Sequence, residues 1–130
     1  MKIKINIETI PHKDHRYETV GDYWIDDNGV RQIRISEMKD WRKMLLVAVH
    51  EMIEQSLCIY YGVSEKDITE FDMEFEKQRE SGLHSDDAEP GDDVNSPYRS
   101  EHFFATNVER LLAAELGVDW NEYDKEIMSL

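Results

Sequence analysis

The sequence has little cysteine and no long apolar run, and each shortage excludes a class of protein. Its one cysteine, Cys58, cannot form an internal disulfide and excludes a zinc module built from several cysteines. The longest apolar run, Met44–Val49, is far too short to cross a bilayer. The first residues also lack the basic and apolar segments of a secretory signal. We therefore expect a cytoplasmic protein with no membrane partner.

Basic residues are scarce as well, since 15 lysines and arginines stand against 29 aspartates and glutamates, a net charge of −14. Such a charge argues against nucleic acid as a direct ligand. Residues 64–93 hold 12 acidic and 3 basic side chains, whereas residues 1–36 hold 6 of each. We expect a solvated acidic face with a flexible loop. The sharper alternatives are a docking surface for a basic partner and a decoy that imitates DNA.

The order of the hydrophobic patterns predicts the fold class. A length of 130 residues fits one domain, 1–130. Residues 2–9 alternate between apolar and polar as a strand with one wet face, and an Asn-Gly turn between residues 23–25 and 30–35 predicts a hairpin. We expect a small three-stranded antiparallel sheet followed by helices, which is an α+β fold.

The helices are predicted from their capping residues and apolar spacing. A helix with Ser36 as N-cap should run to Tyr61 and end at Gly62, and it is apolar almost all round, as a central buried helix would be. The later elements are expected to be a helix capped by Ser64 and packed through Ile68, Phe71 and Phe75, a flexible acidic loop over 81–97, a helix from Tyr98 packed through Phe104, Val108, Leu111, Leu112 and Leu116, and a short helix capped by Asp119.

The buried helix carries a close relative of the zinc-protease signature H-E-x-x-H, in which Glu54 stands at the second histidine. Ligands four residues apart lie on one helical face, and carboxylate oxygens bind zinc at about the same distance as imidazole nitrogens. His50 and Glu54 are therefore predicted metal ligands. Glu51, beside the first ligand, is the predicted general base for a metal-activated water.

A zinc ion needs a third protein ligand and an open position for water. His102, at the start of a later helix, is the first choice, and His84 in the acidic loop is the second. Zinc is the expected metal, although iron and manganese suit the same ligands. The other candidates are set aside, His12 and His15 as solvated, and Cys58 as a buried residue about 12 Å along the helix from His50.

Three further residues are candidates for an assisting role. Tyr98, one turn before His102, is placed to donate to a developing oxyanion. Glu109 shares a helical face with His102, and either Glu109 or Asp72 is a candidate to orient a ligand. A surface salt bridge is the plainer interpretation for both carboxylates.

A hairpin, a His50-Glu51-x-x-Glu54 helix and a later histidine together resemble the zincin-like metallopeptidase superfamily. In size and layout the chain is similar to the small zincin-like proteins of phages and prophages. The motif match is local, and the layout match covers most of the chain. The resemblance implies that His50 binds the metal, that Glu51 is the general base, and that a peptide or protein substrate lies along residues 30–35 as an edge strand. Glu54 departs from the family pattern, which leaves the reaction open.

Three other interpretations remain. His50 and Glu54 can form a hydrogen-bonded pair in a metal-free core. Glu51 and Glu54 also match half of the magnesium site of all-helical NTP pyrophosphohydrolases, with Glu89 and Asp92 as the nearest second half. The third interpretation is a non-enzymatic acidic interaction protein, of the kind that phages encode as decoys, that blocks a basic surface on a host protein.

Overall fold

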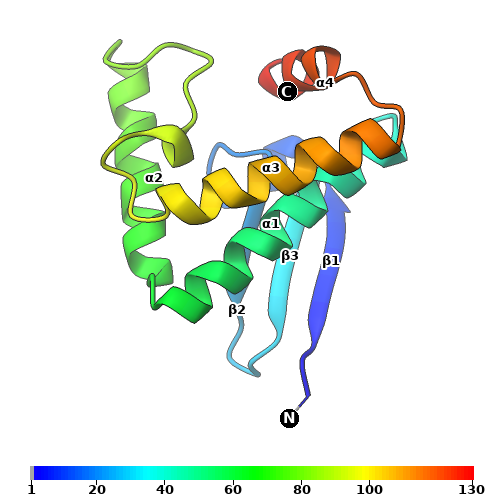
Figure 1. Cartoon of the computed structure of the whole chain (residues 1–130). Helices are drawn as coiled ribbons and strands as arrows, with labels where there is room; N and C mark the ends of the chain where they lie inside the picture. The colour runs from blue at the N-terminus through cyan, green and yellow to red at the C-terminus, as the bar shows by residue number, and fades with distance from the viewer. Residues whose placement is uncertain (1) are drawn as a thin grey trace.

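A three-stranded sheet and four α-helices make up residues 2–130, the part of the chain that the computed structural model describes (Figure 1). The sheet precedes the helices, so the predicted α+β class is confirmed. Two short 3-10 helices, η1 (His12–Asp14) and η2 (Pro90–Asp92), lie in connections. The main elements are β1 (Ile5–Ile10), β2 (Gly21–Ile25), β3 (Arg31–Ser36), α1 (Trp41–Tyr61), α2 (Glu65–Glu80), α3 (Arg99–Glu115) and α4 (Trp120–Met128).

The predicted hairpin is confirmed, since β2 and β3 are antiparallel neighbours joined by the Asn-Gly turn. The Asp26 carboxylate closes this turn by accepting from the backbone N–H groups of Asn28 at 2.9 Å and Val30 at 3.0 Å. Gly29 has a φ of 78°, a conformation that glycine adopts without a steric penalty. The turn residues therefore set the register of the hairpin.

The sheet is mixed, and the prediction of a wholly antiparallel sheet is wrong. Its order is β1-β3-β2, and β1 runs parallel to β3. Residues 11–20 cross from the end of β1 to the start of β2, which leaves β1 and β3 pointing the same way. Ile33 and Ile35 on β3 are almost fully buried, as a central strand requires. Residues 30–35 are therefore not an edge strand, and the edges are β1 and β2.

Helix α1 begins later than predicted. Ser36 is the last residue of β3, and its hydroxyl is bound by His12 Nδ1 at 2.8 Å and His15 Nε2 at 2.9 Å, so it cannot cap a helix. The actual N-cap is Asp40, whose carboxylate accepts from the backbone N–H of Arg42 at 2.9 Å. Both histidines are partly buried, and the expectation that they are solvated is also wrong.

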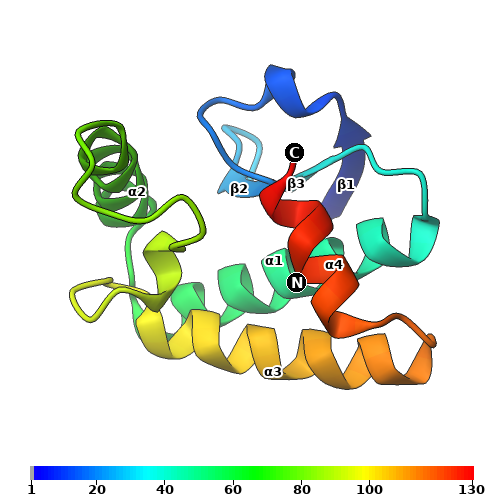
Figure 2. The same cartoon turned by 90° about the horizontal axis from the view of Figure 1, so that it is seen from above.

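Helix α1 lies between the sheet and α3, so the fold has three layers (Figures 1 and 2). It ends at Tyr61 as predicted, and Gly62 takes the left-handed conformation with a φ of 74°. The core lies mainly between α1 and the sheet, and its buried side chains there are Tyr23, Ile33, Ile35, Leu46, Val47, Ala48 and Cys58. A central buried helix was expected from the sequence, and the layers show how it is covered.

Helix α2 stands at the β2 side of the molecule (Figure 2). It begins as predicted, with the Ser64 hydroxyl accepting from the backbone N–H of Asp67 at 3.1 Å, and it buries Ile68 and Phe75. The acidic segment 81–97 follows. It is held near α2 by the Arg79 guanidinium, which donates to the backbone carbonyls of Ser85, Asp86 and Ala88. The flexibility expected of this segment stays a prediction.

Helix α3 is rotated so that part of the apolar stripe predicted for it faces solvent. Phe104 and Leu111 of the predicted apolar stripe are 55% and 71% exposed, whereas His102, Ala105 and Glu109 are buried. The buried polar side chains have partners on α1, described below, and these partners fix the rotation of the helix. The stripe prediction is wrong for Phe104 and Leu111, because these polar contacts outweigh the burial of two large apolar side chains, whereas Leu112 and Leu116 pack against the core as predicted.

Helix α4 returns to pack on α3 and α1. Asp119 caps it as predicted, accepting from the backbone N–H of Glu122 at 2.9 Å. An ion pair of 2.7 Å joins Lys43 on α1 to Glu126 on α4. Within residues 2–130, every helix falls short of the length and apolar character needed to cross a membrane.

Candidate metal centre

Three side chains from α1 and α3 bring their ligand atoms to one point. His50 Nε2 lies 2.9 Å from Glu54 Oε2 and 3.1 Å from His102 Nδ1, and the last two atoms are 2.8 Å apart. All three residues are buried, with exposures of 7%, 4% and 9%. The structure thus brings together the three predicted ligands in a group that could hold a metal ion. We call this group the ligand triad.

The outward ring nitrogen of His50 is held by a second carboxylate. His50 Nδ1 lies 2.8 Å from Glu109 Oε1, and Glu109 also accepts from the Tyr123 hydroxyl on α4. Glu109 is buried, so the surface salt bridge considered for it is wrong, and it orients His50 instead. A carboxylate on the far nitrogen of an imidazole is the usual device that fixes a metal-binding histidine.

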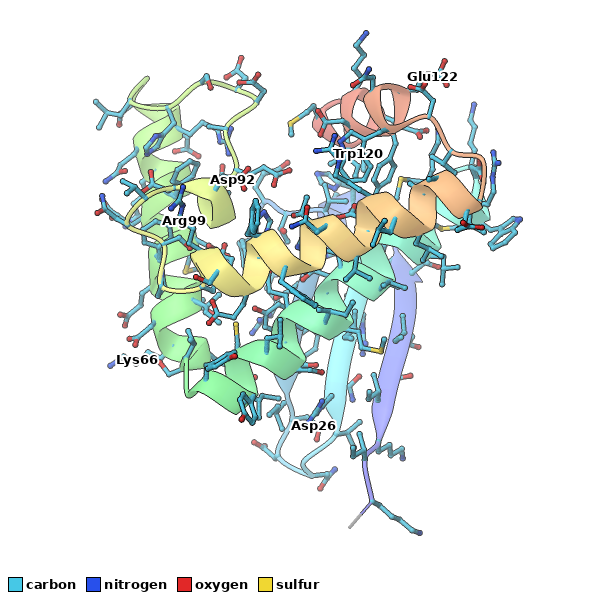
Figure 3. All side chains as sticks on the ribbon, in the orientation of Figure 1. Asp26, Lys66, Asp92, Arg99, Trp120 and Glu122 are labelled. Carbon is cyan, nitrogen blue, oxygen red and sulfur yellow. The ribbon has the colours of Figure 1, made fainter. Side chains whose placement is uncertain are left out.

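The other two ligands are also held from outside the triad. The Tyr23 hydroxyl on β2 donates to Glu54 Oε1 at 2.8 Å. His102 Nε2 lies 3.1 Å from Glu89 Oε2 and 3.4 Å from Asp92 Oδ1. Figure 3 shows Asp92 near the start of α3. His102 is the fourth residue of that helix. Every ligand therefore has one atom fixed outward and one atom aimed at the centre.

The acidic segment covers His102 with its backbone as well as its carboxylates. A Cβ atom at Gly91 would lie 2.5 Å from His102 Cγ and 2.6 Å from His102 Nδ1, a clash in either case. Gly91 is itself buried, and only glycine lets the chain pass so close to the imidazole. Segment 81–97 is thus a wall of the triad.

The outward contacts leave one ring nitrogen of each histidine and one oxygen of Glu54 directed at the centre of the triad. An imidazole whose one N–H donates to an outer carboxylate presents a bare nitrogen on its other side. His50 and His102 both have such an outer carboxylate, and Glu54 adds the oxygen that Tyr23 does not use. Three acceptors at these separations repel one another unless a cation or protons lie between them.

The pKa values show how strongly the triad attracts positive charge. Burial lowers the pKa of His50, but the Glu109 and Glu54 carboxylates outweigh burial and raise this pKa to about 10. At His102, burial is again outweighed by neighbouring carboxylates, Asp92 first, and the pKa rises to about 12. Burial raises the pKa of Glu54, yet its hydrogen bonds from the two histidines hold it below its usual value. The triad therefore favours two positive charges.

A cavity of about 290 Å³ lies beside the triad, and Glu51 faces it from α1. The Glu51 carboxylate packs against Gly21, the first residue of β2, where a Cβ would lie 2.6 Å from Glu51 Oε1. Burial, and then the charge of Glu54, raise the pKa of Glu51 well above its usual value. The predicted base and the predicted ligands thus share one cavity.

Tyr98 does not occupy the place predicted for it. Its hydroxyl donates to Asp72 Oδ1 at 2.6 Å, and the Tyr17 hydroxyl donates to Asp72 Oδ2 at 3.1 Å. The single phenolic proton of Tyr98 is committed to a buried carboxylate, so it is not a free donor for an oxyanion. Asp72 is buried too, and it holds two tyrosines rather than a metal ligand or a surface partner.

The remaining candidates lie away from the triad. His84 stacks on Phe75 at 3.9 Å between ring centroids and lies 2.8 Å from Gln78. Cys58 is buried as predicted, and burial raises the pKa of its thiol to about 12. Sequence reasoning missed the roles of three groups that hold the triad from outside. These groups resemble ordinary strand, helix and loop residues in the sequence, and they are Tyr23, Tyr123 and Glu89.

No protein-family model matches the chain, and comparison with curated proteins and with solved structures yielded no match. Function is therefore argued from the chemistry of the triad and its cavity.

Proposed function

We propose that the chain is a zinc-dependent hydrolase of peptide or amide bonds, in which the ligand triad holds the ion and Glu51 is the general base. The observation that carries the proposal is the convergence of three ligand atoms, two imidazole nitrogens and one carboxylate oxygen, on side chains that are each held at their other polar atom by another group. A metal-free hydrogen-bonded pair of His50 and Glu54 needs neither a third ligand residue nor a group that holds the far side of each side chain. A catalytic zinc site needs both, together with an open side.

The spacing of the triad suits a small divalent ion. Zinc bonds of about 2.0–2.1 Å in tetrahedral geometry place ligand atoms about 3.3 Å apart. The observed separations of 2.8 to 3.1 Å need to widen by only a few tenths of an ångström. Two imidazoles with one carboxylate are a frequent ligand set for catalytic zinc, and iron or manganese is the alternative occupant. Zinc, when bound, supplies a Lewis acid and lowers the pKa of water.

Glu51 is the proton carrier that this chain itself provides. It directly follows the ligand His50, faces the same cavity, and, within residues 2–130, rests against Gly21 rather than against a hydrogen-bonding partner. A carboxyl group whose pKa is raised above its usual value accepts a proton from an attacking water and returns it to a leaving amine more readily than an ordinary glutamate. Gly21 is then a positioning residue, because its missing side chain leaves the space that Glu51 fills.

The edge strand we propose for a peptide substrate is β2, in place of residues 30–35. The Ser36 N–H donates to the Val20 carbonyl, so alternate residues from Val20 onward bond to β3 and those between them face the free edge. Tyr23 is one of the latter, and so is Ile25, whose N–H donates to Glu65 of α2 at 2.6 Å. An extended peptide added here would lie between β2 and α2, beside the triad.

The zincin-like relationship is part of the same proposal. It is supported by the order of hairpin, motif helix and third-ligand helix, with the edge strand β2 beside the metal site. The substitution of Glu54 for the usual histidine keeps the ligand count and changes the net charge of the site by one unit. A more negative site holds the ion more tightly and weakens its pull on a carbonyl.

Metal analysis of protein purified without chelator tests the proposal. We expect about one zinc per chain in the wild type, little in His50→Ala, and the wild-type amount in His84→Ala, a matched loss of a histidine outside the triad. Glu51→Gln should keep the metal and lose cleavage of a mixed peptide library. Wild-type protein that takes up no divalent metal would remove the basis of the proposal.

The two other function classes make different predictions. The acidic-decoy interpretation is supported by the exposed carboxylates of Asp86 and Asp87, and charge reversal there should abolish partner capture while His50→Ala leaves it intact. For the pyrophosphohydrolase, paired helices would have to carry both acidic halves. Glu89 and Asp92 lie instead in and beside the short η2 turn, so we do not propose that activity.

A further inference from the structure

A second buried polar group lines the cavity and takes no part in the proposed reaction. Asp72 of α2 is only 7% exposed, and its two oxygens accept from the Tyr98 and Tyr17 hydroxyls at 2.6 and 3.1 Å. Tyr98 precedes His102 by one turn of α3, so this carboxyl lies near the triad. Both tyrosines also line the cavity. We call Asp72 and these two tyrosines the Asp72 subsite.

The Asp72 carboxyl has acceptor capacity left after these contacts. A carboxylate offers about four lone-pair positions, and two phenolic donors occupy two of them. In the described part of the chain, residues 2–130, no arginine, lysine or histidine makes a hydrogen bond or an ion pair with Asp72. A buried carboxylate without a cationic partner is costly, and a cation from outside the chain would relieve that cost.

Within residues 2–130, no cationic side chain of the cavity wall makes a hydrogen bond or an ion pair with Asp72, and the two triad histidines, which also line the cavity, are bonded to other carboxylates. Among residues 2–130, Arg79 is the one arginine that lines the cavity, and no lysine does. Arg79 is fully engaged, because its guanidinium bonds to Glu76 and to three backbone carbonyls of segment 81–97. Lys66, also on α2, is 80% exposed at its side chain and points outward (Figure 3).

We propose that the Asp72 subsite binds the positively charged end of a ligand, a guanidinium or an alkylammonium group, inside the cavity. The planar guanidinium fits best, because it can bond to both carboxylate oxygens, each of which accepts from only one tyrosine. Tyr17 and Tyr98 then orient the carboxyl and add aromatic faces to the wall. The cation that the subsite selects comes from the ligand, since no cationic side chain of residues 2–130 is paired with Asp72.

The remaining observations support a small cationic ligand. A cavity of about 290 Å³ is at the lower end of the range for ligand pockets, enough for a single long side chain. Burial is the main cause that raises the pKa of Asp72 to about 7, although the tyrosine hydrogen bonds lower it. A bound cation favours the ionised carboxylate. A role of the subsite in substrate selection rests on the proposed hydrolase function. In that role the subsite would select peptides with arginine or lysine beside the cleaved bond.

Binding of n-butylguanidinium, measured by calorimetry and by amide chemical shifts, tests the subsite directly. Its neutral isostere n-butylurea is the ligand control. We expect the guanidinium to bind the wild type and to shift residues of the cavity wall, and n-butylurea to bind negligibly. Asp72→Asn should weaken the guanidinium at least about 10-fold, since hydrogen bonds to charged groups contribute that much. Asp67→Asn, the same change at an exposed position of α2, should bind as the wild type does.

Equal binding by wild type and Asp72→Asn would overturn the proposal, as would shifts confined to the exposed carboxylates of residues 81–97 or no binding at all. If Asp72→Asn fails to fold, as judged by circular dichroism, the chemical-shift map of the wild type decides alone. Zinc content is measured on the same samples. Zinc binding without guanidinium binding would contradict the proposed subsite and support the metal centre. Guanidinium binding without zinc would support the subsite and contradict the metal centre.

Discussion

Zinc binding should release two protons from the ligand triad. The pKa values of His50 and His102, about 10 and about 12, mean that both imidazoles carry a second proton at pH 7. Each keeps its outer N–H, which donates to Glu109 or Glu89, and each must lose its inner proton to bind a metal. One divalent ion then replaces two unit charges, and the net charge of the buried site is unchanged.

The magnitude follows from this exchange. While pH lies below both folded-state pKa values, bound protons compete with zinc, so affinity must rise as pH rises. Two protons released per ion correspond to a factor of about 100 in apparent affinity for each pH unit, between roughly pH 6 and pH 9. Above the pKa of His50 the slope should fall toward one, because that proton has already left.

Calorimetric zinc titration in several buffers of different ionisation enthalpy measures the protons released. Glu109→Gln is the informative variant, because it removes the first carboxylate that raises the pKa of His50. This variant should release closer to one proton at pH 8 and bind zinc about 10- to 100-fold more weakly, as loss of an outer partner usually does. Tight zinc binding with no proton release in the wild type would refute the protonated triad.

The remaining predictions concern groups that hold the site and the first helix. Gly21→Ala should displace Glu51 and reduce hydrolysis while zinc content, measured by metal analysis, stays near one per chain. Retained full activity would contradict the positioning role. Gly91→Ala should displace the His102 ring and weaken zinc binding, measured by competition with a chromogenic chelator. Unchanged zinc affinity would show that segment 81–97 moves to accommodate the methyl group. Asp40→Ala should lower the free energy of unfolding by about 1 kcal/mol, the usual cost of losing an N-cap, as checked by urea denaturation, whereas no loss would mean that the cap is dispensable.

The features that could be predicted from the sequence are those that neighbouring residues decide. The caps at Ser64 and Asp119 and the stop at Gly62 depend on a few adjacent backbone groups, and the structure has all three. The separation of His50 and Glu54 by one turn is equally local. His102 could be chosen because few histidines compete for the role and because it begins a helix.

Features that depend on distant partners were beyond the sequence patterns. Alternation in residues 2–9 shows which side chains share a face and does not show which strand lies alongside, so the parallel pairing of β1 was missed. The rotation of α3 was missed because apolar spacing favoured Phe104 and Leu111, while contacts of His102 and Glu109 with α1 decided the outcome. Tyr98 had a buried partner on another helix that its spacing could not reveal.

The position of the third ligand also bears on how the chain is held together. Glu54 and His102 are 48 residues apart, and between them lie α2 and the whole acidic segment. A disulfide that closed a loop of this size would restrict the unfolded chain by about 4 kcal/mol, but a chain with one cysteine cannot form one. An ion shared by α1 and α3 would act as a removable cross-link. Removal of the ion by a chelator would lower the stability of the folded chain, which would therefore depend on the concentration of available metal.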